Sequence, residues 1–206
     1  AGSAWATVYD AGHYAARRRG DELLYYPSGP AIRQAALGHT ATAADFAWLR
    51  TIQYYGQHKK TDRDYTMMAH LVEIITELDP HFVNAYIFGG LVTAQDAGDP
   101  TRAVALMEKG VAANPDSWEM AFETGFVYYV CGAYPQAARH FERAVHLPGA
   151  PEKAMRFAAA AAARAGDPRM AHTLWKMFAG TTNNAEMREK AEAAMRRLEG
   201  EGARHA

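Results

Sequence analysis

The residues best suited to acid–base chemistry gather in one short stretch, QHKKTDRDYT, at residues 57–66. It contains His58, Asp62, Asp64 and Tyr65, and a histidine beside carboxylates is a pairing used in general acid–base catalysis. The same residue types also keep turns soluble and cap helices, which is the favoured interpretation here. The Asp-x-Asp pair lacks the further ligands and the glycine of a calcium loop. The stretch therefore predicts a polar turn, and catalysis is the weaker alternative.

The nine histidines are scattered along the chain and are not paired for metal binding. Two histidines that hold zinc from one helix stand four residues apart, as in HExxH, and no such pair occurs. We therefore expect no metal site and no cofactor. The histidines are expected at the surface or at its boundary: His13, His39, His58, His70, His81, His140, His146, His172 and His205.

The single cysteine, Cys131, allows no internal disulfide, so the cysteine count does not indicate whether the protein lies in an oxidising or a reducing compartment. A lone cysteine in an apolar run is usually a small buried residue, and this is the prediction for Cys131. No GxSxG, GxxxxGK[ST] or GxGxxG motif is present, so no nucleophile elbow or phosphate-binding loop is expected. Gly89 and Gly90 are better explained by close helix contact.

Charge and composition narrow the range of partners. Acidic and basic residues nearly balance in the 206-residue chain, whose net charge is −1, so we expect no nucleic-acid partner. The only dense basic run, Arg17–Gly20, favours a solvated helix end over a membrane-surface contact. No stretch approaches the roughly 20 apolar residues of a membrane-spanning helix. The chain begins AGSAWATVYD, which leaves the presence of an upstream signal peptide or membrane anchor as an alternative.

The elements that would position these residues are short helices punctuated by glycine and proline. Between residues 124 and 144, small residues recur at regular steps between aromatic ones. Small residues allow two helix backbones to approach closely, and aromatic rings fill the space beside them. The segment therefore predicts a helical hairpin with Gly132 in its turn. The small residues are Gly125, Gly132, Ala137 and Ala144, and the large ones are Tyr128, Tyr134 and Phe141.

This order of residues resembles the tetratricopeptide repeat (TPR), a helix-turn-helix unit of about 34 residues. Residues 116–150 fill its positions except the closing proline, where LPGAP stands. Residues 81–115 and 151–181 show the same pattern, and in both a GDP sequence marks the turn. There Pro100 and Pro168 are expected to open the second helix.

Three further segments complete the expected organisation. Residues 43–80 form a degenerate hairpin with a longer turn at 56–66. Residues 182–200 form a charged capping helix that begins with a capping box of Asn183 and Glu186. Residues 1–42 form a non-repeat N-terminal segment, either a short hairpin or an extended segment.

The resemblance implies an all-α fold, a right-handed α-solenoid of antiparallel helix hairpins. It also implies a non-enzymatic interaction module in which the first helix of each hairpin lines a concave groove for a protein or peptide segment. Aromatic residues in its centre would act as binding hot spots. The alternative is that the N-terminal segment or helix packing covers these aromatic residues. By resemblance the groove residues are Phe46, Leu49, Gln53, Asn84, Ile87, Leu91, Glu119, Phe122, Phe126, Tyr129, Lys153, Arg156 and Arg164.

The groove differs from that of cochaperones that clamp a C-terminal carboxylate with Lys and Asn. The corresponding positions hold Leu49 and Gln53, then Ile87 and Leu91, so no such clamp is expected. Lys153 and Arg156 at the basic end suit an acidic segment, which is a weaker expectation.

The chain as a whole resembles bacterial membrane-anchored TPR proteins, from YYPSG through ADFAWLRTIQYYG to the repeats. This implies membrane proximity through an N-terminal anchor and a periplasmic or extracytoplasmic location, with the cytoplasm as the other location. We expect an interaction scaffold or assembly factor. The alternative is a permanent structural subunit of a larger membrane-associated or extracellular assembly.

Overall fold

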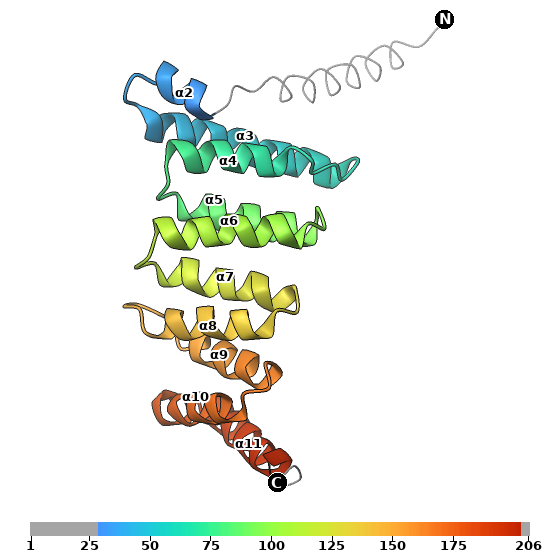
Figure 1. Cartoon of the computed structure of the whole chain (residues 1–206), viewed down its shortest axis with the longest axis vertical. Coiled ribbons are helices and arrows are strands. Elements are labelled where there is room, and N and C mark those ends of the chain that lie inside the picture. The colour runs from blue at the N-terminus through green and yellow to red at the C-terminus, as the bar shows by residue number, and fades with distance from the viewer. Residues whose placement is uncertain (1–28, 203–206) are drawn as a thin grey trace, which may run out of the picture. The chain divides into compact units, whose positions relative to one another are not determined.

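The computed structural model describes residues 29–202, a part of the chain made of helices joined by short connections, with no strand (Figure 1). The chain divides into two compact units, Ala1–Asp79 and Pro80–Ala206. The predicted all-α fold of antiparallel helix hairpins is confirmed. The predictions for residues 1–28 and for His205 lie outside the described residues.

The first unit is built on a hairpin of α3 (Thr40–Lys60) and α4 (Met68–Leu78), with the short α2 (Gly29–Ala35) packed on both. Helix α4 is buried over most of its length because its sequence, MAHLVEIITEL, is largely apolar. Helix α3 buries only one face, whose buried residues follow a helical spacing, although its exposed side also carries large apolar residues. These are Ala44, Ala47, Thr51 and Tyr54.

The predicted turn at residues 56–66 is too long, because α3 continues to Lys60. Gly56 lies inside the helix, where a Cβ atom would meet nothing within 4 Å, and its backbone does not adopt a positive φ. Glycine lowers helix propensity but does not by itself end a helix. The chain reverses instead around Arg63, which has a φ of 57°.

The second unit contains three helix hairpins and a final helix. Successive helices pack against each other along the chain, and α7 also contacts α5. We call α5, α7 and α9 the first helices and α6, α8 and α10 the second helices. The bounds are α5 (Val83–Gln95), α6 (Pro100–Ala113), α7 (Trp118–Val130), α8 (Tyr134–Val145), α9 (Lys153–Arg164), α10 (Pro168–Thr181) and α11 (Ala185–Gly202).

Close helix packing explains the alternation of small and aromatic residues. A Cβ atom on Gly125 of α7 would lie 2.8 Å from Cδ1 of Phe141 on α8, so only glycine fits without displacement. Gly90 of α5 lies against Met107 of α6 in the same way. The predicted contacts between small and large residues are therefore present in both hairpins.

The turns inside these hairpins follow the predicted chemistry. Gly132, between α7 and α8, has a φ of +78°, a backbone region that favours glycine. Pro100 and Pro168 begin α6 and α10, as predicted from the two GDP sequences. In those turns the aspartate side chains, Asp99 and Asp167, act as N-caps.

Two local predictions are wrong. Cys131 is exposed, because α7 ends at Val130 and the apolar run continues into the turn. The cap of α11 is formed by Asn184 and not by Asn183, since Asn184 Oδ1 accepts a hydrogen bond of 3.1 Å from the backbone N–H of Met187. Two adjacent asparagines have the same capping ability, so the sequence pattern did not distinguish them.

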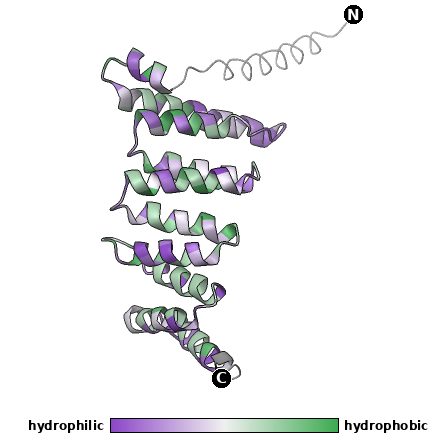
Figure 2. Cartoon of the chain, viewed as in Figure 1, coloured by the Kyte–Doolittle hydropathy of each residue, from purple (hydrophilic) through white to green (hydrophobic). Residues whose placement is uncertain are grey.

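The two helices of the central hairpin differ in hydropathy (Figure 2). Helix α7 is apolar along most of its length, whereas α8 carries a polar face with Gln136, Arg139, His140 and Arg143. A helix that is apolar on several sides has more than one packed face. Helix α7 therefore packs on neighbours and also leaves apolar side chains at the surface.

Candidate functional site

The second unit carries an aromatic and cationic surface on α7 and α9. Five alanines of α9 are buried, at positions 154, 158, 159, 161 and 162. The remaining sides of α9 leave its large residues half-buried or exposed. We call the following side chains the first-helix surface: Phe126, Tyr129, Lys153, Phe157 and Arg164.

Aromatic rings form two pairs at this surface, and the buried ring of Phe141 contacts one member of each pair. The ring centroids of Phe126 and Phe157 lie 6.2 Å apart, and those of Tyr129 and Tyr134 lie 5.4 Å apart. Both pairs meet edge to face, an arrangement that aromatic rings favour. The pairs offer rigid apolar contact area at the surface, which is typical of binding hot spots.

Cations lie over rings at both ends of α9. The guanidinium carbon of Arg164 is 4.9 Å from the ring centroid of Tyr129 and 5.3 Å from that of Tyr134. At the other end, Lys153 Nζ is 4.6 Å from the ring centroid of Phe122. Cation–π contacts of this kind hold the charged groups in place without neutralising them.

These cations keep their charge available. Among the described residues, none of Lys153, Arg156 and Arg164 has a carboxylate oxygen within 4.0 Å. One acid on α7, Glu123, does interact with Lys153 over a longer distance. Burial raises the pKa of Glu123, and the charge of Lys153 opposes that rise. The positive charge at the Arg164 end of the surface is thus the one least offset by acidic side chains of the protein itself.

The predicted groove residues do not all lie at this surface. Phe46, Leu49 and Gln53 are exposed on α3 in the first unit, where Phe46 is 64% and Leu49 56% exposed. Asn84 is exposed on α5, and Ile87 and Leu91 on the same helix are half-buried.

On α7, Glu119 is half-buried and lies 3.0 Å from the Ser117 hydroxyl at the helix start. Phe122 is only 3% exposed and packs on Phe141 and Phe157. It therefore belongs to the core, which corrects its predicted surface position. Side-chain contacts join the remaining predicted residues of α7 and α9: Phe126 meets Phe157, Arg164 lies over Tyr129, and Lys153 lies over Phe122. Arg156 is not part of this group, because it contacts the Phe178 ring of α10 and Met187 of α11.

Sequence reasoning missed two aromatic members of the site, Tyr134 and Phe157. Tyr134 is the first residue of a second helix, yet it contacts Arg164 of α9 through its ring and its hydroxyl. Phe157 stands four positions after Lys153 and seven before Arg164, so the helical period places it on the same side of α9 as these two predicted residues. This spacing was the signal that could have identified it.

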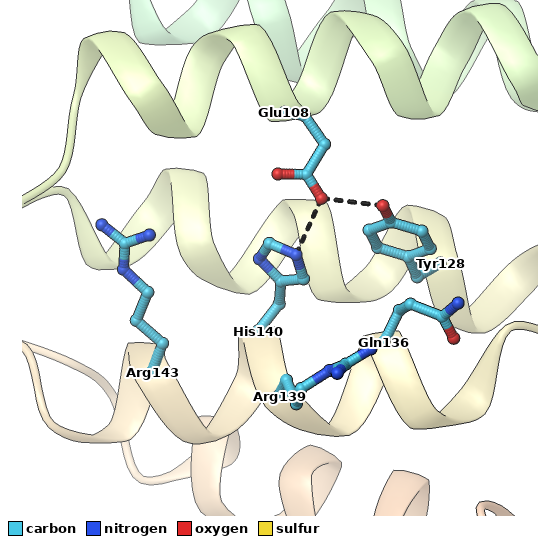
Figure 3. A pocket seen from close by; sticks show the side chains of 6 residues that line it. All are labelled: Glu108, Tyr128, Gln136, Arg139, His140 and Arg143. Atoms are coloured by element: carbon cyan, nitrogen blue, oxygen red, sulfur yellow. Dashed lines mark hydrogen bonds and ion pairs between the residues drawn. The ribbon is translucent and has the colours of Figure 1, made fainter.

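A second cluster joins α6, α7 and α8 (Figure 3). Glu108 Oε1 accepts hydrogen bonds from the Tyr128 hydroxyl at 2.7 Å and from His140 Nε2 at 3.0 Å. The rings of Tyr128 and His140 stack with centroids 5.3 Å apart. With Gln136, Arg139 and Arg143 these groups line a pocket of about 330 Å³.

The protonation chemistry of this cluster favours a structural role. Burial, the hydrogen bond to Glu108 and its negative charge raise the pKa of Tyr128 to about 12, so its phenol stays protonated at neutral pH. Burial lowers the pKa of His140, and Glu108 only partly opposes this effect. Both groups then donate to one carboxylate oxygen, which ties three helices together.

The predicted polar turn has hydrogen bonds that occupy its carboxylates. Asp62 Oδ1 lies 2.6 Å from His58 Nδ1 and accepts a hydrogen bond of 3.1 Å from the Asp64 backbone N–H. Asp64 in turn accepts hydrogen bonds from the Thr66 backbone and hydroxyl. These bonds hold the pKa values of both aspartates below the usual range. The cluster stabilises the turn, and its acids are not poised to accept a proton.

The range of residues 29–202 contains no group of three or more His, Cys, Asp or Glu side chains arranged to hold a metal ion. None of its helices is both long enough and apolar enough to span a bilayer.

No protein-family model matches the sequence, and no curated protein matches it. Similar solved structures include two of MamA, both 16% identical with a TM-score of 0.49. They cover 71% and 78% of this chain, and 94% and 91% of their own. A thermophilic TPR protein in Thermus thermophilus is 14% identical, with a TM-score of 0.47 over 80% of this chain and 94% of its own.

These values are too low to carry an argument about function. The chain's own geometry shows TPR-like helix hairpins, with glycine of one helix against a large side chain of the next. A fold by itself names neither a function nor a partner.

Proposed function

We propose that the protein is a non-enzymatic interaction scaffold or assembly factor that binds a protein segment through the first helices of its hairpins. The observation that carries the proposal is the first-helix surface, where half-exposed aromatic rings lie beside cations that no carboxylate neutralises among the described residues. Exposed rigid aromatics and arginines are the residue types that dominate binding energy at protein interfaces.

Affinity capture with the whole chain tests this function. The wild type is compared with a Phe126→Ala, Tyr129→Ala double variant, whose side chains are only half-buried. Phe122 is left unchanged because it belongs to the core. An Arg139→Ala, Arg169→Ala variant is the matched control, since both arginines are exposed on second helices.

The proposal predicts a protein that is captured by the wild type and the control but lost with the aromatic variant. Capture that persists unchanged with the aromatic variant would place binding elsewhere and contradict the proposal. Circular dichroism of each variant verifies that its helices remain intact.

A second candidate function is a permanent structural subunit of a larger membrane-associated assembly. The supporting observation is the exposed apolar stripe of α3, formed by Phe46, Leu49 and Ile52. Exposed apolar residues on one helix face suit a constitutive interface. The proposed N-terminal anchor and the periplasmic location on a bacterial membrane apply to the scaffold function as well as to this candidate. It predicts that a Phe46→Gln, Leu49→Gln variant is lost from an isolated native complex, whereas the scaffold function predicts unchanged assembly.

A further inference from the structure

We infer that the segment bound by the first-helix surface is an extended acidic peptide that carries one carboxylate on each side of an apolar centre. This inference rests on the proposed function and specifies the chemistry of its partner. It commits to a peptide because the surface combines aromatic contact area with only a few, widely separated cations.

The spacing of the cations sets the spacing of the acids. Lys153 and Arg164 are the first and last residues of α9. At 1.5 Å per residue their backbones are about 16 Å apart along the helix axis. An extended peptide advances about 3.3 Å per residue. Two acidic residues about five positions apart would therefore reach both cations.

The part of the surface between the cations is apolar. Phe126 and Phe157 lie edge to face there, and both rings are half-buried. A partner with apolar side chains between its two acids would cover these rings and remove them from water. Uniformly acidic segments would leave the rings without apolar contacts.

The two ends are not equivalent. Lys153 is influenced by Glu123, whereas Arg164 contacts two tyrosine rings and the Tyr134 hydroxyl, with no described acid within ion-pair distance. Arg164 is also held by these contacts, which lowers the conformational entropy lost on binding a carboxylate. The Arg164 end should therefore dominate recognition of the acidic peptide.

Selection from a phage-displayed library of random peptides, with the whole chain immobilised, tests the inference. Enriched peptides are synthesised and titrated by fluorescence anisotropy. Three variants serve for comparison: Lys153→Gln with Arg164→Gln, Arg139→Gln with Arg169→Gln as the charge-matched control, and Phe126→Ala with Tyr129→Ala. Circular dichroism verifies the fold of each variant.

The expected peptides carry two acids about five positions apart around apolar residues. Their affinity should fall about tenfold with the Lys153/Arg164 variant, remain within about twofold with the charge-matched control, and weaken in high salt. Enriched peptides without acids, or with unchanged affinity for the Lys153/Arg164 variant, would overturn the acidic preference and leave the proposed function standing. If no peptide is enriched on the wild type over the Phe126/Tyr129 variant, both the inference and the proposed function are contradicted.

Discussion

At Gly125 the backbone of α7 comes so close to Phe141 that a side chain has no room. Gly125→Ala should therefore lower the free energy of unfolding by about 1–3 kcal/mol, the usual cost of overpacking a core. The higher helix propensity of alanine offsets only about 1 kcal/mol of such a loss. Urea unfolding followed by circular dichroism measures the change.

Gly180 provides the control for this prediction because it lies near the end of α10, where a Cβ atom would meet nothing within 4 Å. Gly180→Ala should not destabilise the protein, since it adds helix propensity without a clash. Equal losses of stability in both variants would contradict the close-packing explanation.

The second residue-scale prediction concerns His140, whose pKa is lowered in the folded protein because burial disfavours its charged form. The unfolded chain, with a histidine pKa of about 6.5, then binds more protons than the folded protein as the pH falls. This group's contribution to stability is therefore complete above about pH 6.5 and is lost as the pH falls through that value toward the folded pKa. Glu108, Arg139 and Arg143 are the charged groups that influence it.

Unfolding free energies at pH 7.5 and pH 5.5 test this dependence. In His140→Phe the part of the pH slope due to this group should disappear, and the stacked position beside Tyr128 stays filled by a ring. A slope that is identical in wild type and variant would show that His140 is not responsible.

Single residues differed in how well the sequence predicted them. The contact of Gly125 with Phe141 could be predicted because the pattern fixes which residues face each other across a hairpin. The exposure of Cys131 could not, because an apolar run does not show where its helix ends. Phe122 was misplaced because α7 is apolar on several sides, so its buried face is not distinct in the sequence.

At the scale of elements, two of the second helices, α6 and α10, begin with aspartate caps. Asp99 accepts a hydrogen bond of 2.9 Å from the Arg102 backbone N–H, and Asp167 makes the same contact with Met170. Asp99→Ala and Asp167→Ala should each cost about 1 kcal/mol of stability. Thermal and urea unfolding measure the loss.

The matched control for the caps is Glu189→Ala, an exposed acid in α11. It should change the stability by less than about 0.5 kcal/mol, because surface positions without a specific contact have small effects. If the cap variants behave like Glu189→Ala, the aspartates do not stabilise α6 and α10.

Helix starts were easier to predict than helix ends. A GDP sequence places a glycine turn, a cap and a helix-opening proline in consecutive positions, and both examples begin a helix as predicted. The end of α3 was mistaken because Gly56 suggested a stop, although the next turn of the helix still forms. Neighbouring Asn183 and Asn184 show that a cap can be predicted to within one residue while its identity stays undetermined.

At the scale of the whole molecule, the chain has two compact units with different kinds of exposed residues. In the first unit Phe46 and Leu49 are exposed, so Phe46→Gln with Leu49→Gln should leave the unfolding free energy within about 0.5 kcal/mol of the wild type. Leu71→Ala, at a fully buried position on α4, should cost about 2–5 kcal/mol. Urea unfolding of the three proteins measures both differences, and a large loss with the surface variant would show that the stripe is covered within the chain.

The candidate site could be predicted only in part. The repeat resemblance indicated Tyr129 and Arg164 as groove residues, and the structure places them in contact. It did not indicate Tyr134, because side-chain reach between neighbouring helices is a property of the packed unit. Phe157 was also missed, although its position four residues after Lys153 places it on the same side of α9. The uncompensated charge of Arg164 is a tertiary property as well, since it depends on which acids the fold brings near.

Site-specific photo-crosslinking in the native cell tests the central claim most directly. A photoreactive benzoylphenylalanine replaces Tyr129 of the first-helix surface in one strain and Arg139, exposed on α8, in another. Binding through the first helices predicts a discrete crosslinked protein from position 129 and none of that size from position 139. A crosslink to the same protein from position 139, with none from position 129, would contradict the account and place binding on the second helices.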